Sequence, residues 1–275
     1  MTPSLRKSSI HVKQSDETDS RTNFLASGHP ILTDVPENLV ATAASPTGTT
    51  GCFVGFSAGE PRRRHVASIG KLSGIRFMSL FRFKLWWTTH WVGTTGNHVE
   101  SETQFMMLDR DDAVSRPYLL LLPLIEGSFR ASLQPGAVSD HVDVCVESGS
   151  TRVVSSGFRS VLYFHVGNDS PYGLVREAMC VVRKHLGSFR LLEEKTPPPI
   201  VDKFGWCTWD AFYKKVSPKG VREGIIDLAE GSCPPGMIII DDGWQCMTRG
   251  KRPRILPRGG QEKESCGGVE LLGKL

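Results

Sequence analysis

The amino-acid sequence predicts a mainly β protein, in which a β-sandwich is followed by one strand–helix–strand (βαβ) unit. Three observations lead to this fold class. From Ile31 onward, short apolar runs are separated by Gly, Pro, Ser and Asp, which is typical of many short strands. A proline-rich segment, residues 193–200, then interrupts the series. After it, two apolar runs flank one helical pattern within about 40 residues, which is the pattern of a βαβ unit.

The composition fits a folded globular chain. Of the 275 residues, 39% are hydrophobic and 23% are charged, which argues against a disordered protein. A formal net charge of +4 is too small to indicate a nucleic-acid or membrane partner. The longest strongly apolar stretch, residues 118–125, is far shorter than the roughly 20 residues of a membrane-spanning helix.

The cysteines and the amino terminus indicate that the protein stays inside the cell. The seven cysteines are odd in number and widely spaced without C-x-x-C, which favours a reduced protein over a disulfide framework or a cysteine zinc site. Residues 1–29 are polar and lack the apolar region of a secretory signal, so we expect a disordered leader. The expected location is cytoplasmic, with a plastid as the alternative and secretion excluded.

The expected sandwich spans residues 30–192. Its clearest strand is 75–85, where Phe77, Phe81 and Phe83 share one face and Arg82 and Lys84 point the other way. Further strands are expected at residues 51–57, 102–108, 117–125, 141–147 and 159–166. One helix follows them, with Ser170 as its cap, Pro171 in its first turn and Gly187 as its end.

Residues 193–200, EEKTPPPI, are interpreted as a linker because a run of prolines is stiff and cannot join a sheet interior. Residues 201–245 then form the second domain. It contains a strand at 203–209, a helix that Ser217-Pro218 opens and Gly231 ends, and a strand at 237–240. The two strands are expected to be parallel.

Aromatic and acidic side chains follow both of these strands. Trp206, Trp209 and Asp210 lie at the end of the first, and Asp241, Asp242 and Trp244 follow the second. Ligands of parallel α/β sheets and barrels bind outside the carboxyl ends of the strands, so both clusters are expected at one rim.

This combination suits a sugar, because a pyranose packs its C–H face on an indole while its hydroxyls donate to carboxylates. The plainer alternatives are a tryptophan in the core and an aspartate that caps a helix.

These segments resemble a known family. Residues 205–213 (GWCTWDAFY), 216–218, 220–224 and 239–245 (IIDDGWQ) are similar to the plant raffinose synthase group of glycoside hydrolase family 36, which includes stachyose synthases and alkaline α-galactosidases. The 86–91 stretch WWTTHW and the segments at 100–108, 119–127 and 163–169 resemble the group's N-terminal domain. The resemblance covers roughly residues 30–245.

The resemblance implies that the βαβ unit begins a (β/α)₈ barrel. It also implies galactosyl transfer with retention, from galactinol to sucrose in raffinose synthases, without a metal or organic cofactor. The partners are then small sugars, and the oligomeric state stays open. By similarity, Asp241 and Asp242 bind galactosyl hydroxyls, and Trp244, Trp209 and Trp206 help to form the donor pocket.

No catalytic residue is assigned. A (β/α)₈ barrel takes about 200 residues, and only 75 residues follow Ile200. The family's nucleophile and acid/base segments are absent, so we expect this chain to be an inactive fragment. An alkaline α-galactosidase fragment and a non-catalytic carbohydrate-binding sandwich are the alternatives.

Residues 246–275 differ from the rest of the chain. They carry the whole net charge of +4 and contain no aromatic residue. The resemblance ends at Gln245, so a disordered, unrelated tail produced by a change of frame or splicing is expected. A basic nucleic-acid-binding or localisation tail is the less favoured alternative.

Overall fold

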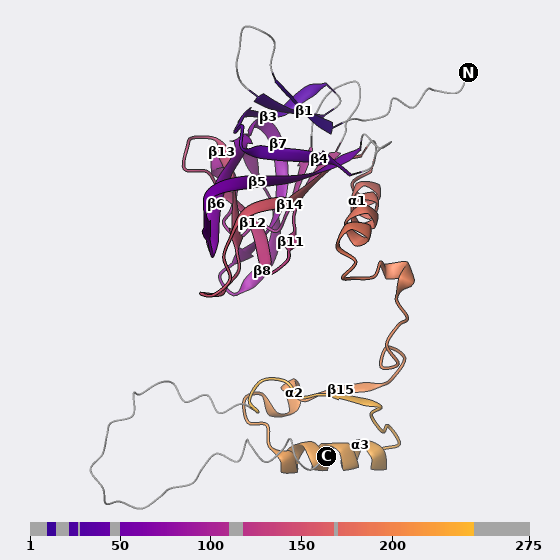
Figure 1. Cartoon of the computed structure of the whole chain (residues 1–275). Helices are drawn as coiled ribbons and strands as arrows, with labels where there is room; N and C mark the ends of the chain where they lie inside the picture. Colours follow the sequence, from indigo (N-terminus) through magenta and orange to yellow (C-terminus); the bar gives the residue numbers. More distant parts are fainter. Residues whose placement is uncertain are drawn as a thin grey trace, which may run out of the picture. The chain divides into compact units, whose positions relative to one another are not determined.

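The structure is a computed structural model that describes residues 10–14, 22–26, 28–44, 50–109, 118–167 and 170–244. The chain divides into two compact units, Met1–Leu192 and Glu193–Leu275. The division falls at the beginning of the proline-rich segment. Each unit is described by itself below (Figure 1).

Unit 1 contains two antiparallel sheets, and seven strands of the described residues form each of them. The first sheet has the order β1 (Ile10–Gln14), β2 (Thr22–Ala26), β3 (His29–Val35), β6 (Arg64–Lys71), β13 (His141–Glu147), β12 (Phe129–Pro135) and β11 (Ile125–Glu126). The second has the order β4 (Leu39–Ala43), β5 (Gly51–Arg62), β14 (Ser155–Val166), β10 (Tyr118–Pro123), β9 (Phe105–Asp109), β7 (Ser73–Phe83) and β8 (Trp86–Thr95).

The two sheets share one apolar core, which confirms the predicted β-sandwich. Leu32, Ile69 and Val144 of the first sheet belong to the same buried cluster as Phe77 and Leu121 of the second. Side chains alternate between the faces of a strand, so alternate residues of the central strands point into this core. A short 3₁₀ helix, η1 (Gly96–His98), follows β8.

Helix α1 (Pro171–Leu186) covers the other face of the second sheet. Leu174, Ala178 and Val182 of the helix cluster with Tyr163 and Leu120 of the sheet. The middle of the sheet is therefore buried on both faces, which explains why four consecutive leucines of β10, residues 119–122, are all buried.

The ends of α1 follow the sequence prediction. The Oγ of Ser170 accepts a hydrogen bond from the Gly173 amide at 3.3 Å, and Pro171 occupies the first turn. Gly187 adopts φ +62°, and its amide donates to the Arg183 carbonyl. A left-handed glycine is the usual end of a helix because it carries no Cβ.

The structure differs from the sequence prediction in the first 29 residues. Strand β2 lies in the segment that was expected to be a disordered leader, and it pairs with β3. Phe24 is buried and stacks on Phe164 with 4.5 Å between the ring centroids. A single buried aromatic ring in a polar segment gives too weak a pattern to predict a strand. The rest of residues 1–21 lies largely outside the described residues.

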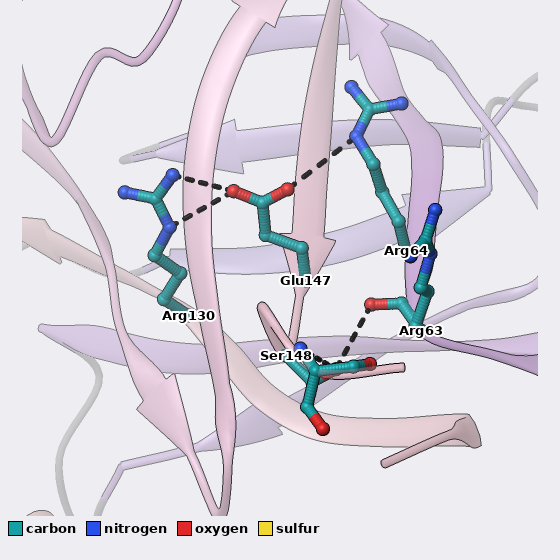
Figure 2. A network of polar contacts seen from close by, with 6 residues as sticks. Arg63, Arg64, Arg130, Glu147 and Ser148 are labelled. Carbon is teal, nitrogen blue, oxygen red and sulfur yellow. Dashed lines mark hydrogen bonds and ion pairs between the residues drawn. The ribbon is translucent and has the colours of Figure 1, made fainter. Parts of the chain in front are cut away.

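The arginine triplet at residues 62–64 forms the exposed connection between two strands. Arg62 ends β5 and Arg64 begins β6. In Figure 2, Glu147 of β13 lies between Arg64 and Arg130; its Oε1 accepts from Arg130 Nε at 3.0 Å, and its Oε2 lies 3.7 Å from Arg64 Nε. These are cross-strand pairs on the sheet surface, which contribute modestly to stability.

Unit 2 contains the predicted βαβ unit. Strands β15 (Gly205–Cys207) and β16 (Met237–Ile239) are parallel, with Trp206 opposite Ile238. Between them lie the short helix α2 (Trp209–Phe212) and helix α3 (Pro218–Glu230). The 3₁₀ helix η2 (Leu192–Glu194) precedes β15. Ser217 caps α3 through a 3.2 Å hydrogen bond from the Gly220 amide to its Oγ, as the sequence predicts. The expected tail, residues 246–275, lies outside the described residues.

The two-stranded sheet leaves apolar side chains exposed. No residue of α3 is buried, and Phe204, Ile239 and Ile240 are 54%, 50% and 43% exposed. Parallel sheets in folded proteins are covered on both faces. Within the described residues, this unit therefore presents strand surface that a larger sheet would bury.

Candidate functional site

The carboxyl ends of β15 and β16 meet at one edge of the small sheet. Because the strands are parallel and Cys207 lies opposite Ile239, the residues that follow each strand leave the sheet together. The Thr208 amide donates to the Ile239 carbonyl at 3.0 Å, which extends the pairing by one step beyond β15. The structure therefore places the aspartates after β16 beside the segment that follows β15.

Asp241 lies closest to that segment. Its amide donates to the Oγ1 of Thr208 at 3.0 Å, and its Oδ2 accepts from the Cys207 thiol at 3.4 Å. Its Oδ1 accepts from the amide of Asp242 at 2.7 Å. Both oxygens of the carboxylate are thus held by neighbouring groups, so the side chain has a defined orientation.

Asp242 differs from its neighbour. Its side chain is exposed, and within the described residues its carboxylate makes no hydrogen bond or ion pair. An exposed carboxylate with unused acceptor positions can take hydrogen bonds from ligand hydroxyls. The pair therefore combines one oriented carboxylate with one that is available to a ligand.

Gly243 brings the turn after β16 against the turn after α2. It adopts φ +100°, and a Cβ at this position would lie 2.5 Å from the Cα of Lys214. Only glycine fits both the left-handed conformation and this close approach. Tyr213, directly before Lys214, also has a positive φ of 48°, which is rare for a large side chain.

The structure places the three tryptophans in different surroundings. Trp244 is 49% exposed beside the aspartates in the sequence, as a platform for a sugar requires. Trp209 does not end a strand, because β15 stops at Cys207 and Trp209 begins α2. Its ring meets Tyr213 edge-on at 5.6 Å.

The ring of Trp206 packs against helices α3 and α2. A Cβ on Gly224 of α3 would lie 2.3 Å from the ring of Trp206, and the ring meets Phe212 edge-on at 6.0 Å. The plainer interpretation, a tryptophan that packs between sheet and helix, fits this position.

Thr208 and Cys207 are the site residues that sequence reasoning missed. Both stand in the same motif as the tryptophans, but a hydroxyl and a thiol give no charge or aromatic signal. Only the parallel pairing of the strands reveals that they contact Asp241.

Other features of the described residues do not add to this site. A surface hollow lies along α3, lined by Pro218, Lys219, Arg222, Glu223 and Ile226, and it does not include the aspartates. The described residues contain no group of three or more side chains able to hold a metal ion. None of their helices is long and apolar enough to cross a membrane.

Comparison with protein families gives a match over most of the chain. Residues 18–263 match the family described as "Raffinose synthase or seed imbibition protein Sip1". The chain belongs to this family. The match continues past Gln245 to residue 263, into the segment that the sequence analysis expected to be unrelated.

Relatives within the raffinose synthase family are closely similar. A galactinol–sucrose galactosyltransferase of Pisum sativum is 51% identical over 269 residues, which cover 90% of this chain and 34% of that protein. One of Oryza sativa subsp. japonica is 58% identical over 233 residues, which cover 80% and 30%. The stachyose synthase of Pisum sativum is 42% identical and is covered to 29%. The chain thus spans about a third of the length of these relatives.

A solved structure also matches. The family 36 α-galactosidase of Geobacillus stearothermophilus, in complex with raffinose, is 12% identical with a TM-score of 0.36. The match covers 82% of this chain and 32% of that one.

Proposed function

We propose that this chain forms the amino-terminal part of a galactosyltransferase of the raffinose synthase type. Such an enzyme moves the galactosyl group of galactinol to sucrose and releases myo-inositol. The adjacent carboxylates of Asp241 and Asp242, at the shared edge of two parallel strands, carry the proposal. The names of the relatives from Pisum sativum and Oryza sativa support it.

In this proposal, the two carboxylates accept hydrogen bonds from neighbouring hydroxyls of the galactosyl group. Each hydrogen bond to a charged group is worth about 1.5–3 kcal/mol, so the pair selects a sugar by the positions of its hydroxyls. Trp244, and Trp209 from α2, provide aromatic surface beside them. Trp206 packs against α3 with one part of its ring and is partly exposed, so it contributes to the wall of the donor pocket only from the α3 side.

We further propose that the 275 residues alone do not transfer galactose. Retaining glycosidases use two carboxyl groups about 5–5.5 Å apart, one as nucleophile and one as acid and base. Asp241 is instead engaged by Cys207 and by the Asp242 amide. The nucleophile and the acid/base would come from further barrel strands of the complete enzyme.

The test compares two proteins with galactinol and sucrose as substrates. One is the 275-residue chain, and the other joins residues 1–244 to the remaining residues of the Pisum sativum relative. We expect raffinose and myo-inositol from the second only. In that protein, D241N and D242N should each lower kcat/KM for galactinol at least about tenfold. D227N, on the exposed side of α3, is the control and should change it less than about twofold.

Each contrary result has a definite meaning. Raffinose formed by the 275-residue chain would show that it is not inactive. Free galactose as the main product of the longer protein would replace transfer by hydrolysis. A longer protein that folds but converts galactinol to neither product would overturn the substrate assignment.

A further inference from the structure

Thr208 is set apart from its neighbours by burial. Its side chain is 0% exposed, and no other residue of the described part of unit 2, residues 193–244, is buried. Cys207 before it is exposed, and Trp209 after it is partly exposed. A buried hydroxyl needs a hydrogen-bond partner, so the contacts of this side chain indicate its role.

Those contacts join the two strand ends. The Thr208 amide donates to the Ile239 carbonyl, and its Oγ1 accepts from the Asp241 amide, each at 3.0 Å. Both partners belong to the main chain on either side of Ile240. The position of the Asp241 backbone is therefore fixed from β15 rather than by its own strand.

An ordinary capping role does not explain the hydroxyl. Thr208 stands at the N-cap position of α2, where a threonine side chain usually accepts a hydrogen bond from the second or third amide of the helix. Here the side chain makes no such bond, and its φ and ψ of −77° and −8° are helical. The hydroxyl is turned to β16 instead.

The Asp241 carboxylate depends on this backbone position. The Cys207 thiol reaches Oδ2 only while Asp241 stays beside the end of β15. The thiol and the Asp242 amide together leave the Asp241 carboxylate in one orientation and turn the chain so that the Asp242 side chain is exposed.

We propose that Thr208 is a positioning residue that aligns the two carboxylates for a galactosyl group, acting through the Asp241 main chain and, next to it, through the Cys207 thiol. What the carboxylates bind rests on the function proposed above. The alignment itself is a property of the unliganded chain and is tested without sugar.

The Cys207 thiol serves as the reporter. The Sγ of Cys207 is held against Oδ2 of Asp241, so loosening of this contact leaves the sulfur more open to alkylation by iodoacetamide. Alkylation of Cys207 is followed by peptide mass spectrometry in the full 275-residue chain, relative to Cys233, which is exposed in the same unit. The D241N variant replaces the charged acceptor by a neutral amide, which should raise this ratio about threefold because the hydrogen bond to the thiol weakens.

T208V keeps the shape of the side chain but removes the acceptor of the Asp241 amide. We expect its Cys207/Cys233 ratio to rise about threefold, like that of D241N, and T208S to stay at the wild-type value. Hydrogen exchange of the Asp241 amide should also accelerate at least about threefold in T208V and not in T208S. A merely space-filling role predicts the opposite order, because valine fills the site and serine does not.

The outcomes are separable from those of the transfer assay. A ratio and an exchange rate that stay unchanged in T208V would overturn the positioning role, whatever the enzyme transfers. If T208V does not fold, exchange at Asp241 in T208A against T208S decides: equal rates overturn the proposal, and faster exchange in T208A supports it. If the alkylation ratio and the exchange rate change as expected but the longer protein does not use galactinol, the proposed sugar is wrong and the positioning role of Thr208 stands.

Discussion

At the scale of single residues, unit 1 contains a chain of three polar side chains between β14 and α1. The Oη of Tyr163 lies 2.8 Å from Nδ1 of His165, and Nε2 of His165 lies 3.3 Å from Oε2 of Glu177. His165 is 2% exposed. Burial lowers the pKa of its imidazole, against the opposing effect of Glu177. The neutral ring then donates from Nε2 to Glu177 and accepts at Nδ1 from the Tyr163 hydroxyl.

This network predicts a loss of stability in acid. The folded-state pKa of His165 is lowered, so below the ordinary value of about 6.5 the unfolded chain binds more protons than the folded chain. The contribution of His165 to stability is therefore complete above about pH 6.5 and is lost as the pH falls below it. Urea unfolding of the full chain at pH values from roughly 7.5 to 5.5 measures how the free energy of unfolding changes with pH.

The matched variants are H165Q and H29Q. H165Q lowers the free energy of unfolding at pH 7.5 but should flatten its decrease towards pH 5.5, because the titrating ring is gone. H29Q, at the exposed start of β3, should leave both unchanged. Equal slopes in wild type and H165Q would show that His165 is not the group responsible.

Residue by residue, the candidate site was predictable where charge and aromatic character mark it. Asp241, Asp242 and Trp244 follow a strand as expected. The surroundings of Trp206 were not predictable in this way: its ring packs beside Gly224 of α3, and a strand sends neighbouring side chains to opposite faces. Which face of the small sheet α3 covers depends on the pairing of β15 with β16, and the sequence of one strand does not contain that information.

At the scale of elements, α1 is the piece that closes the second face of a sheet. Leu174 is 1% exposed in the cluster with Leu120 and Tyr163, and a Cβ on Gly167 would lie 2.8 Å from its Cδ1. L174A should therefore lower the free energy of unfolding by about 2–5 kcal/mol, since a tightly packed site cannot collapse onto the cavity. Urea unfolding followed by tryptophan fluorescence measures this.

Tyr172, two residues earlier in the same helix, is the control. It is 86% exposed, so Y172A should change the free energy of unfolding by less than about 0.5 kcal/mol. Similar effects of the two variants would mean that α1 is not packed on the sheet through its buried face.

Elements were predictable where one face is clearly apolar. The alternation at residues 75–85 corresponds to β7, and the caps of α1 and α3 were identified from Ser-Pro. Strand β8 was not expected, because Trp86, Trp87 and Trp91 are all more than half exposed and the strand has no buried face to produce an alternating pattern. Strand β15 is shorter than expected because Thr208 turns into α2.

At the scale of the whole molecule, the two units differ in how well they bury their apolar surface. Unit 1 has a core between two sheets and a second cluster beneath α1. The described part of unit 2 buries only Thr208 and exposes Phe204, Ile239 and Ile240. Such a two-stranded parallel sheet is stable only marginally without further cover, so we expect unit 2 to open more readily than unit 1.

The first residues of unit 2 should reflect this difference in limited proteolysis. All residues from 192 to 203 are exposed, and the main-chain hydrogen bonds near Lys203 are short turn bonds, such as that from the Val201 amide to the Pro198 carbonyl at 3.0 Å. Trypsin needs an extended, accessible segment, which Lys195 and Lys203 offer there. In contrast, Arg130 and Arg159 lie in paired strands of the sandwich, where cleavage requires unfolding of the sheet.

Brief digestion of the full chain should therefore cut after Lys195 or Lys203 at least about tenfold faster than after Arg130 or Arg159. Mass spectrometry of the products gives the cleavage rates. The L174A variant should bring the rates at Arg130 and Arg159 closer to those at Lys195 and Lys203, because it destabilises unit 1 alone. Early cleavage after Arg130 in the wild-type chain would mean that the sandwich is no more stable than the βαβ unit.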